Sequence, residues 1–489
     1  MSRPLARALL LALSCTAFAG LRAQDAAPVP DLSLDQAVAR AMQKNFDLKI
    51  ESFSTEIAKE SFNAADTLFE PTFIAGTTRT VVQGDPAVGS GQKTDFTDSR
   101  LGVQQLISTG ASVNLSTSLD RNAYNPGTGL SLNPSFNSDV SLNIVQPLLR
   151  GAGSTVTKAT LERTRIGVTI AGLSYKGRVL QVIRDTEAAY YNLIFARGQL
   201  AVKEKSQQLA EQLLEENKTR KLTGVATDLD VLSAEVGVAN ARNGVLLAHQ
   251  AVRNSEDALT ALIGQFEFST PVGAVALPAD TEAVPTFDRS YQLARDNQPD
   301  YVATQHSIRQ LEIDAATAKN GALPTLNLGG TVGYNGTDRT YGKAIGNVPN
   351  GDAYNWQLDL SLSVPWGLHA DKARYRSAMA SLRQQQTRLQ QIEQNLLVNV
   401  RTAVRAVDTN RQSVEIVAKA TELAQRQYEL ELARFKAGLS TSRQVLQTQD
   451  DLETARVNEL QAIVNLRTAV ANLHQLDSTS IARFHVAVQ

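Results

Sequence analysis

Apolar and polar residues alternate along several short stretches of this chain. From Trp356 to Val364 every even-numbered position is apolar and every odd-numbered position is polar. The same period of two occurs at 113–119, 140–144 and 326–335. Alternation over about nine to eleven residues is typical of a strand in a membrane β-barrel. A half-buried strand of a soluble antiparallel sheet has the same period.

Two longer tracts have a helical pattern instead. No proline occurs from 148 to 270 or after 365, so neither tract contains the residue that most disrupts helices. Leu382, Leu389 and Leu396 repeat every seven residues, which is the spacing of a coiled-coil seam. Unbroken helices over Ser154–Leu222 and Asp371–Lys436 would each be roughly 100 Å long. Helices of that length must lie against other long helices.

The chain contains an internal repeat, in which the predicted elements occur twice in the same order. Leu34–Ala41 resembles Phe287–Ala294, and Gly224 corresponds to Gly438 later in the chain. Each copy predicts a short helix, strands, a very long helix, a glycine turn and another helix. We place the first repeat at 24–265, a proline-containing linker at 266–286, the second repeat at 287–478 and a C-terminal tail at 479–489.

The first repeat has the longer strand region. The interval from Pro71 to Pro147 exceeds that from Pro324 to Pro365 by 35 residues. Within it, 96–107 and 111–121 flank the short polar turn 108–110. We predict an added hairpin there, with four strands in the first repeat and two in the second. The alternative is an extracellular excursion folded over the mouth of a barrel.

The N-terminus predicts a secretory signal peptide over 1–23. Arg3 and Arg7 precede a short apolar core, and Ala19 or Ala23 follows it as a cleavage site. Cys15, the only cysteine of the chain, would be removed with it. The alternative is that Cys15 becomes a lipidated N-terminus. No later stretch reaches 18 uninterrupted apolar residues, so a membrane role would have to use strands.

Charge and composition argue against nucleic-acid binding and catalysis. The chain has 48 basic and 49 acidic residues, intermixed, and a net charge of -1, which leaves no basic footprint. Its five histidines are scattered and never at metal-ligand spacing. Asp228 and Asp230 are the nearest thing to a catalytic carboxylate pair, but they follow Thr227 where a helix should begin. We predict no enzyme activity, no metal and no cofactor.

A family resemblance rests on the segments 32–37, 45–48 (NFDL), 146–151 (QPLLRG), 222–232 (LTGVATDLDVL) and 435–446 (FKAGLSTSRQVL). With them, about residues 31–477 resemble the TolC family of outer-membrane factors. The resemblance implies a mainly α fold with a transmembrane β-barrel portion: a homotrimeric barrel continued by a long periplasmic coiled-coil tunnel. It implies a passive outer-membrane channel for efflux or type I secretion, with a periplasmic adaptor and an inner-membrane transporter as partners.

The resemblance also implies two functional sites at the periplasmic end of the tunnel. The tip that meets the adaptor would contain Gly224, Thr227, Gly438 and Thr441. The pore constriction would be formed by Asp230, Gln444 and Gln447. This chain departs from the family at two places. The best-known members have acidic residues at the positions of Gln444 and Gln447. Family contacts that hold the tip shut use a Tyr and an Arg at the positions of Phe435 and Ser440. The alternative interpretation is that both glutamines face solvent or a neighbouring helix.

If only the helices are considered, a second class of function is also consistent with the sequence. A periplasmic structural or adaptor protein could also combine long coiled-coil helices with soluble β-domains. Such an adaptor would be expected to have a single helical hairpin and no repeated apolar-out strands between two pairs of prolines. The alternating strands and the predicted signal peptide therefore favour the outer-membrane channel.

Overall fold

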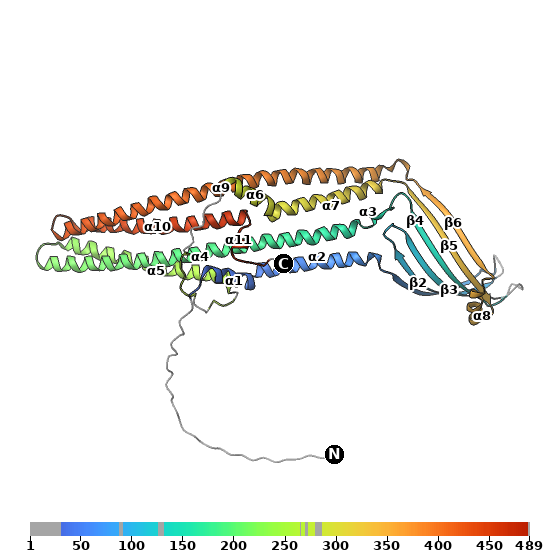
Figure 1. The fold of residues 1–489 in the computed structure, drawn as a ribbon. Helices are drawn as coiled ribbons and strands as arrows, with labels where there is room; N and C mark the ends of the chain where they lie inside the picture. Colours follow the sequence, from blue (N-terminus) through green and yellow to red (C-terminus); the bar gives the residue numbers. More distant parts are fainter. Residues whose placement is uncertain are drawn as a thin grey trace, which may run out of the picture.

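The computed structural model describes residues 31–87, 91–125, 132–264, 266–268, 272–278 and 286–487. The predicted signal peptide, with Cys15, lies outside the described residues. The fold consists of a long helical body and one sheet at its end (Figure 1). No described helix is both long enough and apolar enough to cross a membrane.

The sheet has six antiparallel strands in sequence order. They are β1 (Thr72–Gln83), β2 (Lys93–Leu106), β3 (Ser112–Asn125), β4 (Ser135–Pro147), β5 (Thr325–Asp338) and β6 (Tyr354–Ser363). Four strands come from the first half of the chain and two from the second, and β2 turns into β3 around residues 107–111. The prediction of an added hairpin is therefore confirmed.

Strand register sorts the side chains onto two faces. Leu115, Leu142, Val332 and Trp356 are cross-strand neighbours on an apolar face that runs from β3 to β6. The opposite face is polar, and the Asn143 amide donates a 2.8 Å hydrogen bond there to the Thr331 hydroxyl. This arrangement confirms the predicted alternation. All residues of β1 and β6, the two edges of the described sheet, are exposed.

The helices run in the same order in both halves of the chain. The first half contains α1 (Leu34–Lys44), α2 (Phe46–Asp66), α3 (Ser154–Thr157), α4 (Ala159–Leu222) and α5 (Asp228–Ile263). The second contains α6 (Phe287–Asn297), α7 (Pro299–Gly321), α9 (His369–Lys436) and α10 (Ser442–Leu476). With 64 and 68 residues, α4 and α9 are each roughly 100 Å long. The prediction of two very long helices holds, except that Lys158 separates α3 from α4 with φ −91° and ψ 2°.

Two short helices complete the fold. α8 (Tyr341–Asn347) lies between β5 and β6 and packs Tyr341 edge-on against Phe136, with ring centroids 4.4 Å apart. α11 (Ser480–Arg483) falls within the predicted C-terminal tail and contacts α4 and α10. The tail therefore returns to the helical body.

The largest core lies near the middle of the helical body, where short elements that we call the collar pack against the long helices (Figure 1). The collar consists of α1, α6, α11 and the segment 272–278. The Arg401 guanidinium of α9 lies 5.2 Å from the ring centroid of Phe287 in α6. Arg467 of α10 donates a 3.0 Å hydrogen bond to the Pro278 carbonyl. The collar thus fastens to α4, α9 and α10 by specific side chains.

Candidate functional site

Two helix reversals form a tip at the end of the molecule farthest from the sheet (Figure 1). Gly224 follows α4 with φ +76°, and Gly438 follows α9 with φ +77°. At both turns the second residue after the cap bonds back to the helix, Val225 N–H to the Arg220 carbonyl at 2.9 Å and Leu439 N–H to the Arg434 carbonyl at 2.8 Å. Glycine adopts this left-handed conformation without steric cost, which explains both positions.

The helices that leave the tip begin with matching capping boxes. The Thr227 N–H donates to the Asp230 carboxylate at 2.9 Å, and the Asp230 N–H donates to the Thr227 hydroxyl at 3.2 Å. The Thr441 N–H donates to the Gln444 side-chain oxygen at 3.1 Å in the same way. Hydrogen bonds from Thr227 hold the pKa of Asp230 below its usual value. Asp228 and Asp230 are thus helix-start residues, as the sequence predicted.

Gln447 lies one helical turn further along α10. Its amide donates a 3.1 Å hydrogen bond to the Asp451 carboxylate. The side chains of Asp230 and Gln444 thus bond to the threonines that cap their own helices. The Gln447 side chain lies along α10 toward the exposed Asp451 carboxylate. All seven sequence-predicted site residues lie within the first turns of the two helices after the tip or in the tip itself.

Three apolar side chains at the tip are exposed. Leu222 and Val225 flank the first glycine with exposed fractions of 89% and 64%, and Leu439 follows the second with 72%. The tip turns keep these side chains away from the helical core. The tip of one chain therefore presents an apolar surface bounded by polar caps.

A set of contacts that the sequence did not reveal joins the two tip hairpins. The Arg220 guanidinium donates a 2.7 Å hydrogen bond to the Phe435 carbonyl and lies 4.4 Å from the centre of the Phe435 ring. One turn back along α4, the buried Asn217 amide donates to the buried Ser442 hydroxyl at 2.8 Å. We call these four residues the clasp. They stand 215 and 225 positions apart in sequence, so no local pattern marks them.

The clasp continues toward the collar. The Gln449 amide donates a 2.8 Å hydrogen bond to the Ser206 carbonyl, and Lys203 forms an ion pair with Glu453. These contacts connect α4 to α10 along the part of the helical body next to the tip.

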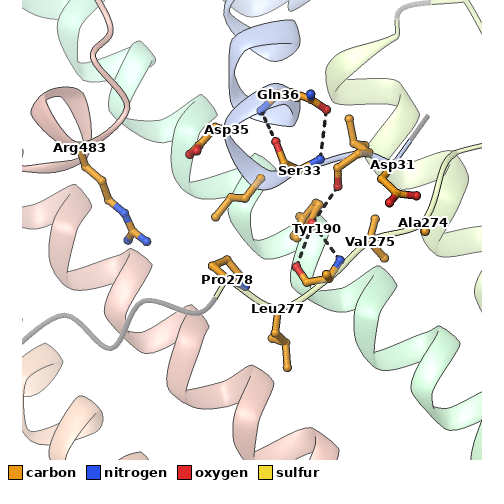
Figure 2. A pocket seen from close by; sticks show the side chains of 13 residues that line it. Asp31, Ser33, Asp35, Gln36, Tyr190, Ala274, Val275, Leu277, Pro278 and Arg483 are labelled. Carbon is orange, nitrogen blue, oxygen red and sulfur yellow. Dashed lines mark hydrogen bonds between the residues drawn. The ribbon is translucent and has the colours of Figure 1, made fainter.

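The collar contains a cavity of about 600 Å³ (Figure 2). At its centre the Tyr190 hydroxyl lies 2.9 Å from the Leu32 carbonyl and 3.0 Å from the Ala276 carbonyl, and it accepts the Ala276 N–H at 3.2 Å. Burial raises the pKa of Tyr190, which keeps the hydroxyl protonated as a donor. The cavity marks a joint between α4, the chain before α1 and the segment 272–278. It contains none of the sequence-predicted site residues.

Metal-ligating chemistry is not assembled in the part of the chain that the structure describes. No three His, Cys, Asp or Glu side chains gather there in a geometry that could hold a metal ion.

Comparison with known proteins gives a family match. The family model for outer membrane efflux proteins matches residues 109–265 and 290–478, which together make up well over half of the chain. The pyoverdine export outer membrane protein OpmQ of Pseudomonas aeruginosa is 24% identical over 399 residues, which cover 73% of this chain and 80% of that protein.

Solved structures share the fold at low sequence identity. The outer-membrane channel OprN has a TM-score of 0.70 and 17% identity, over 91% of this chain and 89% of that one. The Campylobacter jejuni CmeC outer membrane channel has a TM-score of 0.69 and 15% identity, over 91% of this chain and 86% of that one. CusC has a TM-score of 0.71 and 14% identity, over 91% of this chain and 92% of that one.

Proposed function

Because the chain belongs to the outer membrane efflux protein family and is an outer-membrane efflux channel, we propose that three copies close one barrel and one periplasmic tunnel. Six strands from each of three copies give a barrel of 18 strands. Each copy would contribute two helical hairpins to the tunnel, one from each of the proposed repeats 24–265 and 287–478. The tunnel would then be a passive conduit from the periplasm to the outside.

The main support for this proposal is that the sheet of one chain has two open edges, β1 and β6. Neither β1 nor β6 has a second strand partner in the described sheet. Unpaired backbone N–H and C=O groups are not tolerated in lipid, so a membrane sheet must close. Because each copy supplies an even number of strands, β6 of one copy can pair antiparallel with β1 of the next. The same pairing around three copies leaves no edge.

The helical body has complementary open edges. On α5, Leu229, Leu232 and Val236 are 70%, 56% and 53% exposed at helical spacing. Along the half of α9 that ends at the tip, exposed apolar side chains recur every seven residues, namely Ile416, Leu423 and Leu430. A seven-residue apolar seam is typical of helices that pack against a partner helix. We propose that α5 of one copy packs against α9 of its neighbour.

Edge-to-edge cross-linking tests this assembly. Ala75 of β1 and Leu358, Leu360 and Leu362 of β6 lie on the apolar face. Ala75→Cys combined with one β6 cysteine variant should give disulfide-linked trimers under oxidation for at least one of the three pairs, detected on denaturing gels. Removal of Cys15 with the signal peptide would leave only the engineered cysteines. Each single variant is the control, and a monomeric mass in detergent would refute the assembly.

We propose that the exposed apolar tip binds a periplasmic adaptor, which couples the channel to an inner-membrane transporter. Gly224, Thr227, Gly438 and Thr441 would shape this surface through the turns and caps they form. The hairpins of an adaptor could cover Leu222, Val225 and Leu439, whose burial would favour binding.

Introducing charged side chains at the tip should abolish adaptor binding. The double variant Leu222→Asp/Leu439→Asp places carboxylates where apolar contact is proposed, and we expect loss of adaptor co-purification and of efflux in cells. The trimer should persist, because both side chains lie beyond the helix seams. Gln386→Asp, an exposed change on α9 far from the tip, is the matched control. Undiminished adaptor binding by the double variant would contradict the docking surface.

The constriction is proposed at the same end of the tunnel. Asp230, Gln444 and Gln447 stand at the start of α5 and α10, where three copies would converge. With two of these three positions neutral, the ring formed by α10 would be less negative than the acidic ring of the family.

A further inference from the structure

A groove with an unusual lining runs beside α9 at the height of the collar. It has a volume of about 780 Å³ and lies between α4, α9 and α10. The part of the chain that lines it has amide, hydroxyl and aliphatic side chains and no charged one. Its five asparagines define what we call the amide groove: Asn192, Asn399, Asn410, Asn465 and Asn472. A second cavity of about 560 Å³ between α7 and α9 shares Asn399 and Leu476 with it and lies toward the sheet, and its lining includes the charged side chains of Asp300 and Arg388.

The amide groove and the collar lie on opposite faces of the helical layer. On each of three helices, a residue that contacts the collar stands two positions from an asparagine of the groove. The pairs are Tyr190 and Asn192 on α4, Arg401 and Asn399 on α9, and Arg467 and Asn465 on α10. Two positions along an α-helix correspond to a rotation of about 200°. Since the collar covers one face, the bare face with the groove is the one that can enclose a tunnel.

Helix stability does not explain these asparagines. Within a helix Asn is less favourable than Gln, Glu, Lys or Arg, which cover most other polar positions of α9 and α10. Asn192, Asn399 and Asn465 are also exposed, so their amides are accessible to a ligand. Gln461 donates a 2.8 Å hydrogen bond to Asn465, and Asn410 donates a 2.7 Å bond to the Ala406 carbonyl. These hydrogen bonds orient the side chains of Asn410 and Asn465, and other amide groups of the lining stay available to bind a ligand.

We propose that the amide groove is a transit site for uncharged polar substrates, namely peptide-like or sugar-like molecules with several hydrogen-bonding groups. The inference rests on the proposed trimeric tunnel, in which three such grooves would surround the axis. An amide side chain both donates and accepts hydrogen bonds, so it serves such molecules in many orientations. The amide groove itself has no charged side chain in its lining, and several weak contacts permit release as well as binding, as conduction requires.

Saturation-transfer NMR on the detergent-solubilised trimer tests the proposal. The two neutral probes are maltohexaose and N-acetyl-hexaserine amide, and hexa-aspartate is the charged probe. At least one neutral probe should give saturable binding, with hexa-aspartate binding at least tenfold more weakly. The double variant Asn399→Leu/Asn465→Leu should weaken neutral-probe binding at least tenfold. Gln386→Leu/Gln390→Leu, which removes two exposed amides of α9 outside both cavities, should leave it unchanged.

The outcomes separate this site from the assembly that it needs. Binding of only one neutral probe would support the site and identify its substrate as peptide-like or sugar-like. An intact trimer without saturable binding, or an equal loss in the control variant, would overturn the amide groove. Equal binding of hexa-aspartate would overturn the preference for uncharged molecules. A monomer in detergent would instead overturn the proposed trimer.

Discussion

Replacing Arg220 with alanine is expected to open the tip of the channel and raise its single-channel conductance several-fold. Arg220 joins the end of α4 to the end of α9 through a hydrogen bond to the Phe435 carbonyl and through stacking on the Phe435 ring. A hydrogen bond from a charged donor contributes about 1.5–3 kcal/mol, and a cation–π contact adds about 0.5–2 kcal/mol. Their loss leaves Asn217 and Ser442 as the nearest remaining hydrogen bond between side chains of the two hairpins.

The matched control for this change is Lys218→Ala. Lys218 stands in the same turn of α4, but its ion pair with Glu215 lies within the helix and joins no hairpins. Planar-bilayer recordings of purified trimers should show wild-type conductance for Lys218→Ala and increased conductance for Arg220→Ala. Wild-type conductance in Arg220→Ala would remove the clasp from control of the tip.

Local periodicity accounts for the parts of the fold that the sequence predicted. The alternation from Trp356 to Val364 depends only on neighbouring residues, and β6 follows it over Tyr354–Ser363. The absence of proline and the heptad leucines likewise predicted α9 to within two residues at its start. The added hairpin was predictable because its two strands adjoin the same short turn in sequence.

Contacts between distant residues were not predictable in this way. Arg220 looked like an ordinary basic residue in the last turn of a helix, because nothing near it in sequence identifies Phe435 as its partner. The asparagines of the amide groove come from three helices, and only the packing of α4, α9 and α10 brings them together. The sequence did identify Phe435 as a departure from the family, and the structure places the Arg220 guanidinium over that ring.

The capping boxes allow a clean test of charge at the proposed constriction. Asp230 and Gln444 occupy the same position after the two tip turns, and each accepts a hydrogen bond from its capping threonine. Gln444→Asp should therefore keep the cap, since an aspartate already serves it in the first half of the chain. Gln447→Asp would place a carboxylate one turn from Asp451, which now accepts the Gln447 amide.

In the proposed trimer, the double variant Gln444→Asp/Gln447→Asp would therefore add six carboxylates around the pore, two from each of three copies. Like charges that face each other across a narrow pore are stabilised by bound cations, so a trivalent cation should block the double variant strongly and the wild type weakly. Cation selectivity should rise with the added charge. Single-channel recordings with and without hexaamminecobalt(III) measure both effects, and Gln444→Asn/Gln447→Asn controls for side-chain length without charge. Strong block of the wild type, or no change in the double variant, would place these residues outside the pore lining.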